Sequence, residues 1–252
     1  MLKPSTILIT GASSGIGEAL ALAYASSDAN LALIGRHAPR LEKVARECEA
    51  RGAVVHTALI DVREKDKLAE FMLHIDALHP LDLVIANAGV SAGTFCGEDD
   101  LVKAEQVFAV NINGVLNTVH PILPRMVARK RGQIAIISSL AGIAPWPGAA
   151  AYSASKAAVR YYGEALHGHV HKHGVSVSVI CPGWVRTPLV KVNRFPMPLI
   201  MSSSRAATII QRGILRRKTR IAFPLTIYFI LRLLEALPVA WQQKLTRLMP
   251  GK

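Results

Sequence analysis

Cysteine is scarce in this chain of 252 residues. Cys48, Cys96 and Cys181 are odd in number, far apart and without a Cys-x-x-Cys spacing. That pattern excludes a disulfide-based scaffold and predicts free, partly buried thiols in a reducing compartment. Only Met1-Leu-Lys-Pro precedes a segment with the composition of a strand, which leaves no room for a signal peptide. We therefore expect a cytoplasmic protein.

Acidic residues are almost missing from the last quarter of the chain. Residues 186–252 carry 13 of the 30 Lys and Arg residues but only Glu235 among the 17 Asp and Glu residues, which gives 13 − 1 = +12. The net charge of the whole chain is +13, so the first 185 residues are nearly neutral. Basic charge by itself is nonspecific, and neither a reading helix nor an aromatic platform accompanies it. We therefore expect no nucleic acid as a partner.

The apolar stretch near the C-terminus is short. The uncharged stretch 221–231 has 11 residues, too few to span a bilayer. It adjoins the cations Arg216, Arg217, Lys218 and Arg220, and a basic cluster beside an apolar helix suits the surface of an anionic membrane, here its cytoplasmic face. The alternative is that this region covers an active site or forms a subunit interface. The sequence leaves the two interpretations open.

What the chain does contain is a regular alternation of strand-like and helix-like segments. This alternation predicts an α/β fold with a mostly parallel, doubly wound sheet and helices on both faces. Pro121 and Pro124 predict a bend in the longest helical segment. We expect strands at 6–10, 30–35, 53–60, 81–86, 133–139, 175–180 and, at the sheet edge, 221–224, and helices at 18–26, 38–51, 63–78, 101–131, 152–173, 203–215 and 225–237.

A glycine-rich loop lies between the first expected strand and the first expected helix. Gly11, Gly15 and Gly17 allow the backbone to turn sharply and to approach a pyrophosphate, which then meets the free N–H groups of the helix N-terminus. A glycine cluster alone also fits an ordinary tight turn, but here the strand and the helix that the phosphate-binding motif requires are both present.

The ends of the next strands carry further candidate cofactor contacts. Arg36 follows Gly35 at the end of the second strand, where an Arg accommodates a 2′-phosphate and an acid would bind the ribose hydroxyls. This favours NADP(H) over NAD(H), although a solvated Arg at a helix start is the alternative. Asp61 is placed to bind the adenine amino group, to cap the following helix, or both. After the fourth strand, the small residues of Asn87-Ala88-Gly89 let the backbone lie close to a cofactor.

Tyr152 and Lys156 are four residues apart in an expected helix and so share one face. A phenol with a pKa of about 10 is a poor proton donor or acceptor at neutral pH, but a fixed cation nearby favours the phenolate and lowers that pKa. Tyr152 then exchanges a proton with a substrate oxygen, which the Ser139 hydroxyl at the end of an apolar strand is placed to hold. Taken alone, Tyr-x-x-x-Lys is a weak signal, because such pairs occur in many amphipathic helices.

Four histidines near the end of the same expected helix form two i, i+4 pairs, His167 with His171 and His169 with His173. The pairs lie on different helix faces, and neither a carboxylate nor a cysteine completes a ligand set. We therefore expect no metal site and interpret them as a polar helix end.

Taken together, these motifs closely resemble the short-chain dehydrogenase/reductase superfamily of about 250 residues. The matching residues, in family order across roughly the first 190 positions, are Thr10, Gly11, Gly15, Gly17, Asp61, Val62, Asn87, Ala88, Gly89, Asn111, Ser139, Tyr152, Lys156, Pro182, Gly183 and Thr187. One departure is Ala86, where many members have a second Asn. The resemblance implies a seven-stranded Rossmann-type sheet, with 1–190 as the dinucleotide-binding and catalytic core and 191–252 as the substrate loop and C-terminal extension of the same domain.

The resemblance also implies residue roles. Tyr152 is the expected general acid/base, Lys156 lowers its pKa and holds the nicotinamide ribose, Ser139 binds and orients the substrate oxygen, and Asn111 carries a proton-relay water. The expected cofactor contacts are Gly11, Ser13, Ser14, Gly15, Ile16, Gly17, Arg36, Asp61, Val62, Asn87, Ala88, Gly89, Tyr152, Lys156, Val185 and Thr187.

Two functions from different classes remain. The first is an NADP(H)-dependent oxidoreductase, expected as a homo-oligomer, that interconverts an alcohol and a ketone or aldehyde on an apolar or lipid-like substrate. The second is a catalytically silent NAD(P)-binding module at a membrane surface or in a regulatory complex. The complete set of Asn111, Ser139, Tyr152 and Lys156 favours the enzyme, because a silent module does not need it.

Overall fold

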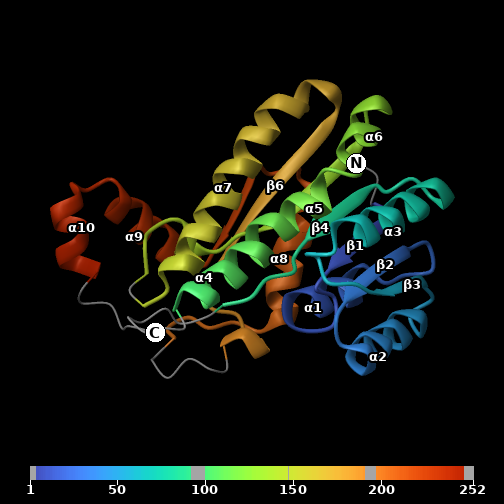
Figure 1. Cartoon of the computed structure of the whole chain (residues 1–252), viewed down its shortest axis with the longest axis horizontal. Helices are drawn as coiled ribbons and strands as arrows, with labels where there is room; N and C mark the ends of the chain where they lie inside the picture. The colour runs from blue at the N-terminus through green and yellow to red at the C-terminus, as the bar shows by residue number, and fades with distance from the viewer. Residues whose placement is uncertain (1–3, 92–99, 147, 191–196, 247–252) are drawn as a thin grey trace.

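A seven-stranded, entirely parallel sheet forms the centre of the protein in the computed structural model, which describes residues 4–91, 100–146, 148–190 and 197–246. Its strand order is β3-β2-β1-β4-β5-β6-β7, and the order reverses between β1 and β4 (Figure 1). In such sheets ligands bind outside the carboxyl ends of the strands at this reversal. The strands are β1 (Thr6–Thr10), β2 (Asn30–Gly35), β3 (Val54–Leu59), β4 (Leu83–Ala86), β5 (Gly132–Ile137), β6 (Val175–Pro182) and β7 (Arg220–Phe223).

Helices cover both faces of this sheet, as Figure 1 shows. The α-helices are α1 (Gly15–Tyr24), α2 (Ala38–Glu49), α3 (Lys65–Leu78), α4 (Asp100–Phe108), α5 (Gly114–Val119), α6 (Leu123–Ala128), α7 (Ala150–Val170), α8 (Ser203–Leu215), α9 (Leu225–Glu235) and α10 (Val239–Thr246). The short helical turns are η1 (Ala109–Asn113), η2 (Leu140–Gly142), η3 (His171–His173) and η4 (Pro188–Val190).

Alternate residues of β1 point into two different cores. Ile7 and Ile9 pack with side chains of α1, α2 and α8, whereas Leu8 between them packs with side chains of α3, α5 and α7. Because both faces are covered, all five residues of β1 are buried. This explains why the strand is a continuous apolar run rather than an alternating one.

The sequence-based prediction of a doubly wound α/β fold is confirmed, and the sheet is parallel throughout. The largest difference is in the segment 101–131. The chain is helical from Asp100 to Val119 with the π-helical turn η1 inside this run, and the helix is interrupted at residues 120–122 just before α6. Pro121 lies at the interruption, whereas the proline pattern gave no sign of the π-helical turn.

The C-terminal region contributes both to the sheet and to a separate small core. The predicted helix 203–215 and the predicted edge strand are confirmed, and β7 pairs in parallel with β6. Beyond it, Leu231 and Leu234 of α9 pack on Leu140 and Cys181. Among the described residues, no helix is both long and apolar enough to cross a membrane.

Candidate active site

A cavity of about 520 Å³ opens at the carboxyl ends of the central strands. It extends from the glycine loop after β1, past the ends of β2 and β3, to the N-terminal part of α7. Almost all of the predicted site residues line it: Gly11, Ser13, Ser14, Gly15, Ile16, Arg36, Asp61, Val62, Asn87, Ala88, Gly89, Ser139, Tyr152, Lys156, Val185 and Thr187. The two exceptions, Gly17 and Asn111, are not among the lining residues.

The glycine loop is shaped by backbone conformations and contacts that side chains would disturb. Gly11 and Gly15 have φ angles of 65° and 64°, in the left-handed region that favours glycine. Gly17 has a different reason to be glycine, because a Cβ there would lie 2.3 Å from the carbonyl oxygen of Gly11. The loop therefore packs directly on the start of α1, and the first two residues of this helix, Gly15 and Ile16, line the cavity. This cradle fits a dinucleotide pyrophosphate.

Asn87 holds this loop to the end of β4. Its Nδ2 donates hydrogen bonds to the carbonyl oxygens of Thr10 at 2.9 Å and Gly11 at 3.2 Å. The Thr10 hydroxyl in turn accepts hydrogen bonds from the backbone N–H groups of Asn87 and Ala88. Asn87 and Thr10 thus fix the two adjacent strand ends to each other.

At the far end of the cavity, Arg36 lies next to Asp61 rather than alone. Its Nη1 is 3.2 Å from Asp61 Oδ2, and its side chain is 59% exposed. The hydrogen bonds of Arg63, with the charge of Arg36, lower the pKa of Asp61 to about 2, so this carboxylate is ionised at neutral pH. Sequence reasoning missed two neighbours: Arg40 lines the same part of the cavity, and the His37 ring accepts a hydrogen bond from the Arg40 backbone N–H.

At the near end, Tyr152, Lys156 and Ser139 come together as predicted. The Lys156 Nζ lies 5.8 Å from the centre of the Tyr152 ring and donates a 2.9 Å hydrogen bond to the Ile137 carbonyl oxygen. Ser139 and Tyr152 are joined by a side-chain hydrogen bond. A second bond, from the Ser138 hydroxyl to the Lys156 carbonyl oxygen at 2.7 Å, holds the end of β5 against α7.

The electrostatics of this pair differ from the expectation. Burial raises the pKa of Tyr152, and the hydrogen bond with Ser139 lowers it only in part. Burial also lowers the pKa of Lys156 to about 8. The expected net lowering of the Tyr152 pKa by Lys156 is therefore wrong for the chain by itself, because withdrawal from water disfavours both the phenolate and the ammonium ion.

Asn111 is completely buried in the π-helical turn η1 and acts on its surroundings through three hydrogen bonds. Its Oδ1 accepts from the Val90 backbone N–H at 2.9 Å, and its Nδ2 donates to the Val90 carbonyl oxygen and to the Ser155 hydroxyl, both at 3.0 Å. Asn111 therefore connects the loop after β4 to α7. Its partner on α7, Ser155, lies between Tyr152 and Lys156 in the sequence. The π-helical turn is the feature that brings this side chain inward, and such turns are frequent at functional sites.

A second, smaller cavity of about 100 Å³ adjoins the first, and the two share Ser139 and Tyr152. Its other walls are largely apolar. Trp146 and Trp184 stand edge to face with ring centres 5.6 Å apart. Ile227 and Leu231 of α9 close the opposite side. One face of α9 thus lines this cavity. From the sequence, this helix was expected either at a membrane surface or over an active site or subunit interface.

The histidines of the α7 end do not form a cluster with other ligands. His167 Nδ1 accepts a hydrogen bond from the Val177 backbone N–H, and its ring is 5.1 Å from that of His171. Within the described residues, no group of three or more His, Cys, Asp or Glu side chains is placed to hold a metal ion. Cys96 lies outside the described residues.

Comparison with known proteins identifies this arrangement. The family model described as "short chain dehydrogenase" matches residues 5–196. The chain belongs to the short-chain dehydrogenase family. As a member of this family, it is an NAD(P)-dependent oxidoreductase, and the glycine loop, Asn87 and the Tyr152–Lys156 pair lie within the matched residues.

This short-chain dehydrogenase is similar over nearly its whole length to other members. An uncharacterised oxidoreductase of Myxococcus xanthus is 37% identical over 234 residues, which cover 92% of each chain. A short-chain dehydrogenase/reductase of Burkholderia phymatum, solved in complex with NAD, has a TM-score of 0.85 at 26% identity and covers 92% of this chain and 94% of its own. One from Sphingobium yanoikuyae, solved with NADPH, has a TM-score of 0.82 at 25% identity, covering 98% and 96%.

Proposed function

We propose that this short-chain dehydrogenase is an NADP(H)-dependent enzyme that interconverts an alcohol and a ketone or aldehyde on an apolar, lipid-like substrate. One observation carries the proposal: Ser139 and Tyr152 line both the long cavity and the apolar cavity next to it. Two polar groups at the junction of two cavities suit a reaction between a cofactor in one and a substrate in the other.

The bound nicotinamide supplies or accepts the hydride. The rest of the chemistry belongs to the chain's own side chains. Ser139 and Tyr152 hold the substrate oxygen between them, and Tyr152 gives a proton to this oxygen during reduction or takes one during oxidation. The Lys156 ammonium ion lies beside the phenol and binds the cofactor ribose. Asn111 is proposed to hold the water that relays the proton onward through its Oδ1, because its Nδ2 already donates to Val90 and Ser155. Pro182, Gly183, Val185 and Thr187 also line the long cavity, and they would hold the nicotinamide.

The preference for NADP(H) over NAD(H) rests on the cations at the adenosine end. Arg36 and Arg40 both line this end and supply the positive charge that a 2′-phosphate needs. Asp61 neutralises part of that charge through its 3.2 Å contact with Arg36. The balance favours the phosphate, because Arg63 also pairs with the same carboxylate at 2.9 Å and so leaves Arg36 less strongly held.

The proposal that the substrate is apolar rests on the lining of the second cavity. Trp146, Trp184, Ile227 and Leu231 surround the space next to Tyr152, and among the described residues that line it none has a charged side chain. Placing an ionised substrate there would remove its charge from water without a compensating partner.

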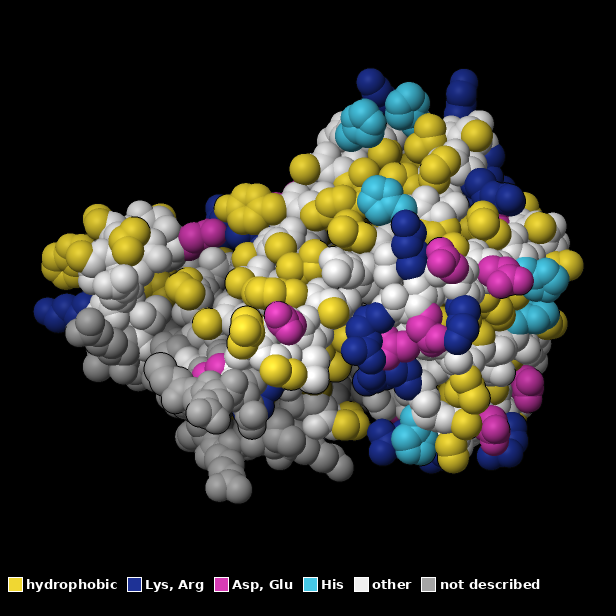
Figure 2. Space-filling view, in the orientation of Figure 1, with side chains coloured by type: hydrophobic (Ala, Val, Ile, Leu, Met, Phe, Trp, Pro, Cys, Tyr) yellow, Lys and Arg dark blue, Asp and Glu magenta, His cyan; other side chains and the backbone are white. Residues whose placement is uncertain are grey.

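The attachment of this enzyme to an anionic membrane surface is the second part of the proposal. Phe229, Ile230 and Leu233 of α9 are exposed on the side away from the apolar cavity, and Trp241 of α10 is 61% exposed. Figure 2 shows hydrophobic side chains at the surface where α9 and α10 lie in Figure 1. An exposed apolar helix face beside cations offers the two kinds of attraction that stable attachment needs.

One residue of the expected lipid-binding cluster has a different partner. Arg216, Arg217 and Lys218 are exposed and have no ion pair among the described residues, whereas Arg220 is ion-paired with Glu164 at 2.7 Å. We therefore leave Arg220 out of the proposed membrane contact. The three exposed cations supply the electrostatic attraction to the membrane, at about 1 kcal/mol each.

Self-association is proposed through another surface. Leu101, Val102 and Phe108 of α4 and Tyr161 of α7 are large apolar side chains exposed on neighbouring helices. Exposed apolar side chains on two adjacent helices suit a subunit interface. Sedimentation equilibrium at several protein concentrations measures the assembly, and a monomer at all of them would remove this part of the proposal.

Turnover tests the enzymatic proposal. Purified protein is assayed with NADPH or NADH against methyl ketones of increasing chain length, and in reverse against the matching alcohols. We expect faster turnover with NADPH and a kcat/KM that rises with chain length. Arg36→Ala should weaken NADPH binding and leave NADH binding nearly unchanged. Equal binding of the two cofactors by the unaltered protein would contradict the preference, and no turnover of any ketone or alcohol would favour a silent binding module.

Vesicle co-sedimentation tests the membrane proposal. The protein should sediment with anionic vesicles at low salt, less at high salt, and not with neutral vesicles. Phe229→Ser with Leu233→Ser should weaken this sedimentation, whereas Leu78→Ser, at an exposed apolar position on α3, serves as the matched control. If the unaltered protein stays in the supernatant at low salt, the exposed face of α9 has another role.

A further inference from the structure

Arg160 is a buried cation one helical turn beyond Lys156 on α7, and its side chain is only 3% exposed. Its Nε donates a 3.0 Å hydrogen bond to the carbonyl oxygen of Gly142. Gly142 ends the turn η2 that begins directly after Ser139, and a Cβ on Gly142 would lie 2.6 Å from the carbonyl carbon of Lys156. Arg160 thus holds the turn that follows Ser139 tightly against the helix that carries Tyr152.

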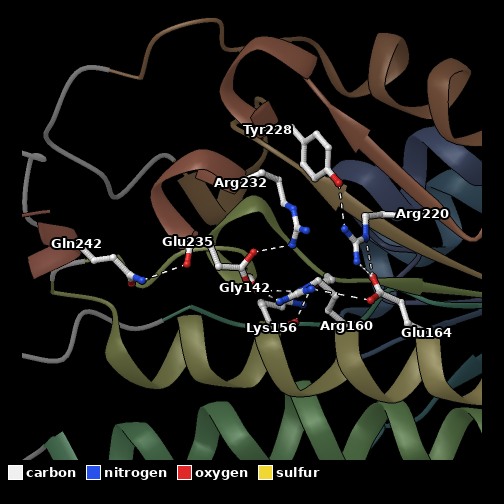
Figure 3. Close-up of polar contacts among 10 residues, drawn as sticks. Gly142, Lys156, Arg160, Glu164, Arg220, Tyr228, Arg232, Glu235 and Gln242 are labelled. Carbon is white, nitrogen blue, oxygen red and sulfur yellow. Dashed lines mark hydrogen bonds and ion pairs between the residues drawn. The ribbon is translucent and has the colours of Figure 1, made fainter. Parts of the chain in front are cut away.

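The other side of the same guanidinium faces α9. Arg160 Nη2 donates to Glu235 Oε1 at 3.2 Å, and Nη1 lies 3.8 Å from Glu164 Oε2 (Figure 3). Glu235 is the last residue of α9. One buried side chain therefore connects the Ser139 turn, α7 and the end of α9 at once.

A second connection between α7 and α9 runs parallel to the first. Arg220 of β7 is ion-paired with Glu164 at 2.7 Å, and its Nη1 donates a 2.9 Å hydrogen bond to the Tyr228 hydroxyl on α9. Tyr228 and Glu235 are seven residues apart, which is two helical turns, so they lie on one face of α9. Figure 3 shows both residues reaching from α9 toward Arg160 and Arg220.

The part of α9 held by these two attachments forms one side of the apolar cavity. Leu231, half-way between Tyr228 and Glu235 and 3% exposed, lines that cavity together with Ile227. Among the described residues that line the longer cavity, none comes from α9. A shift of α9 would therefore change the apolar cavity more than the longer one.

We propose that Arg160, Glu164, Arg220 and Glu235, here named the α7–α9 clamp, fix the substrate-cavity wall in place relative to Tyr152, and that Arg160 is a positioning residue for large substrates. This inference rests on the proposed function, because it assigns the apolar cavity to the substrate. The guanidinium suits the task because its planar fork holds its donor nitrogens apart in fixed directions, toward the Gly142 carbonyl, Glu235 and Glu164, whereas the three donors of a lysine ammonium share one nitrogen. Arg160 is buried and its acidic partners are only partly exposed, so this network favours one position of α9.

The experiment compares Glu235→Ala and Glu235→Gln with Arg232→Ala. Arg232 is the matched control, because it pairs with the same Glu235 but is exposed on the surface of α9. Steady-state kinetics are measured with butanone and undecanone as small and large ketones, alongside NADPH binding. Hydrogen–deuterium exchange of residues 225–235 is followed in the same proteins and reports on α9 without any need for activity.

We expect Glu235→Ala to raise the KM for undecanone about tenfold, the usual effect of losing a hydrogen bond to a buried charge. For the same variant, the kcat and the KM for butanone and the affinity for NADPH should stay close to those of the unaltered protein. Glu235→Gln keeps an acceptor oxygen and should restore much of the KM, and Arg232→Ala should change little. Exchange in 225–235 should be faster in Glu235→Ala only.

Two results would overturn the clamp. One is an unchanged KM for undecanone with unchanged exchange in α9. The other is a parallel loss of NADPH affinity and of activity toward both ketones, which would mean that Glu235 supports the whole fold rather than the cavity wall. Arg160→Lys provides a second variant that keeps the charge but also loses the Nε bond to Gly142, so only its KM for undecanone and its exchange in 225–235 are expected to match those of Glu235→Ala. If the unaltered protein turns over no ketone, the proposed function fails, while the exchange measurement still tests the clamp.

Discussion

Lys156 is buried inside the protein, and replacing it with methionine should change how the stability of the fold depends on pH. Burial lowers the pKa of Lys156 from 10.5 to about 8. Below pH 8 the amine is protonated in both the folded and the unfolded chain, so the full cost of burying the charge opposes folding. Between pH 8 and 10.5 the unfolded chain keeps this proton and the folded chain does not, and stability therefore rises with pH through this window.

The size of the effect follows from the two pKa values. A change from 10.5 to about 8 corresponds to roughly 3 kcal/mol in the free energy of unfolding, gained as the pH rises from 7.5 to 10.5. Other groups act in the opposite direction, because burial raises the pKa of Cys48 and of Cys181 to about 11 and the folded state then retains their protons longer. Both cysteines are present in Lys156→Met as well. Their contributions therefore cancel when the free energy of unfolding of this variant is subtracted from that of the unaltered protein.

Urea unfolding of the cofactor-free protein at half-unit pH steps measures this difference. We expect the stability of the unaltered protein relative to Lys156→Met to increase steadily above pH 8. Lys43→Met, an exposed lysine on α2, controls for the loss of one positive charge. A stability difference that stays constant from pH 7.5 to 10.5 would refute the reasoning, because Lys156 would then titrate at the same pH in the folded and unfolded chain.

Two further substitutions test the construction of the site. Gly17→Ala places a Cβ 2.3 Å from the Gly11 carbonyl oxygen, so the glycine loop must move. We expect the affinity for NADPH, measured by fluorescence titration, to fall at least tenfold. An unchanged affinity would mean that the loop does not hold the cofactor. Asn111→Ala leaves the backbone N–H and carbonyl of Val90 without their Asn111 partner. We expect the free energy of unfolding to fall by about 1–3 kcal/mol. A variant as stable as the unaltered protein would contradict the bridging role of Asn111.

The fold was predictable because its signals are local. A strand buried on both faces needs a continuous apolar run, and residues 6–10 and 30–35 provide such runs with the bounds that the structure has. The cofactor cavity was predictable for a related reason. Carboxyl ends of parallel strands meet at one edge of the sheet, so residues that follow strands, such as Gly11 and Asp61, had to come together.

What the sequence could not provide depends on packing between distant segments. Arg160 reads as an ordinary polar position in a helix, and only the packing of α9 and the Ser139 turn against α7 encloses it. The same packing divides α9 into a face that lines a cavity and a face that is exposed, so the exposed face remains for the proposed membrane contact to be tested. The pKa of Tyr152 was predicted with the wrong sign, because helical spacing reveals the neighbouring cation but not the extent of burial.

The most direct test of the proposed chemistry is the activity of Tyr152→Phe, which removes one hydroxyl and keeps the ring. Initial rates with NADPH and a long-chain methyl ketone are compared with NADPH binding by the same protein. We predict that kcat/KM falls by about 10²–10⁴-fold, the usual contribution of a general acid, while NADPH binds as before. A variant that binds NADPH and retains most of its turnover would contradict the assignment of Tyr152 as the proton donor.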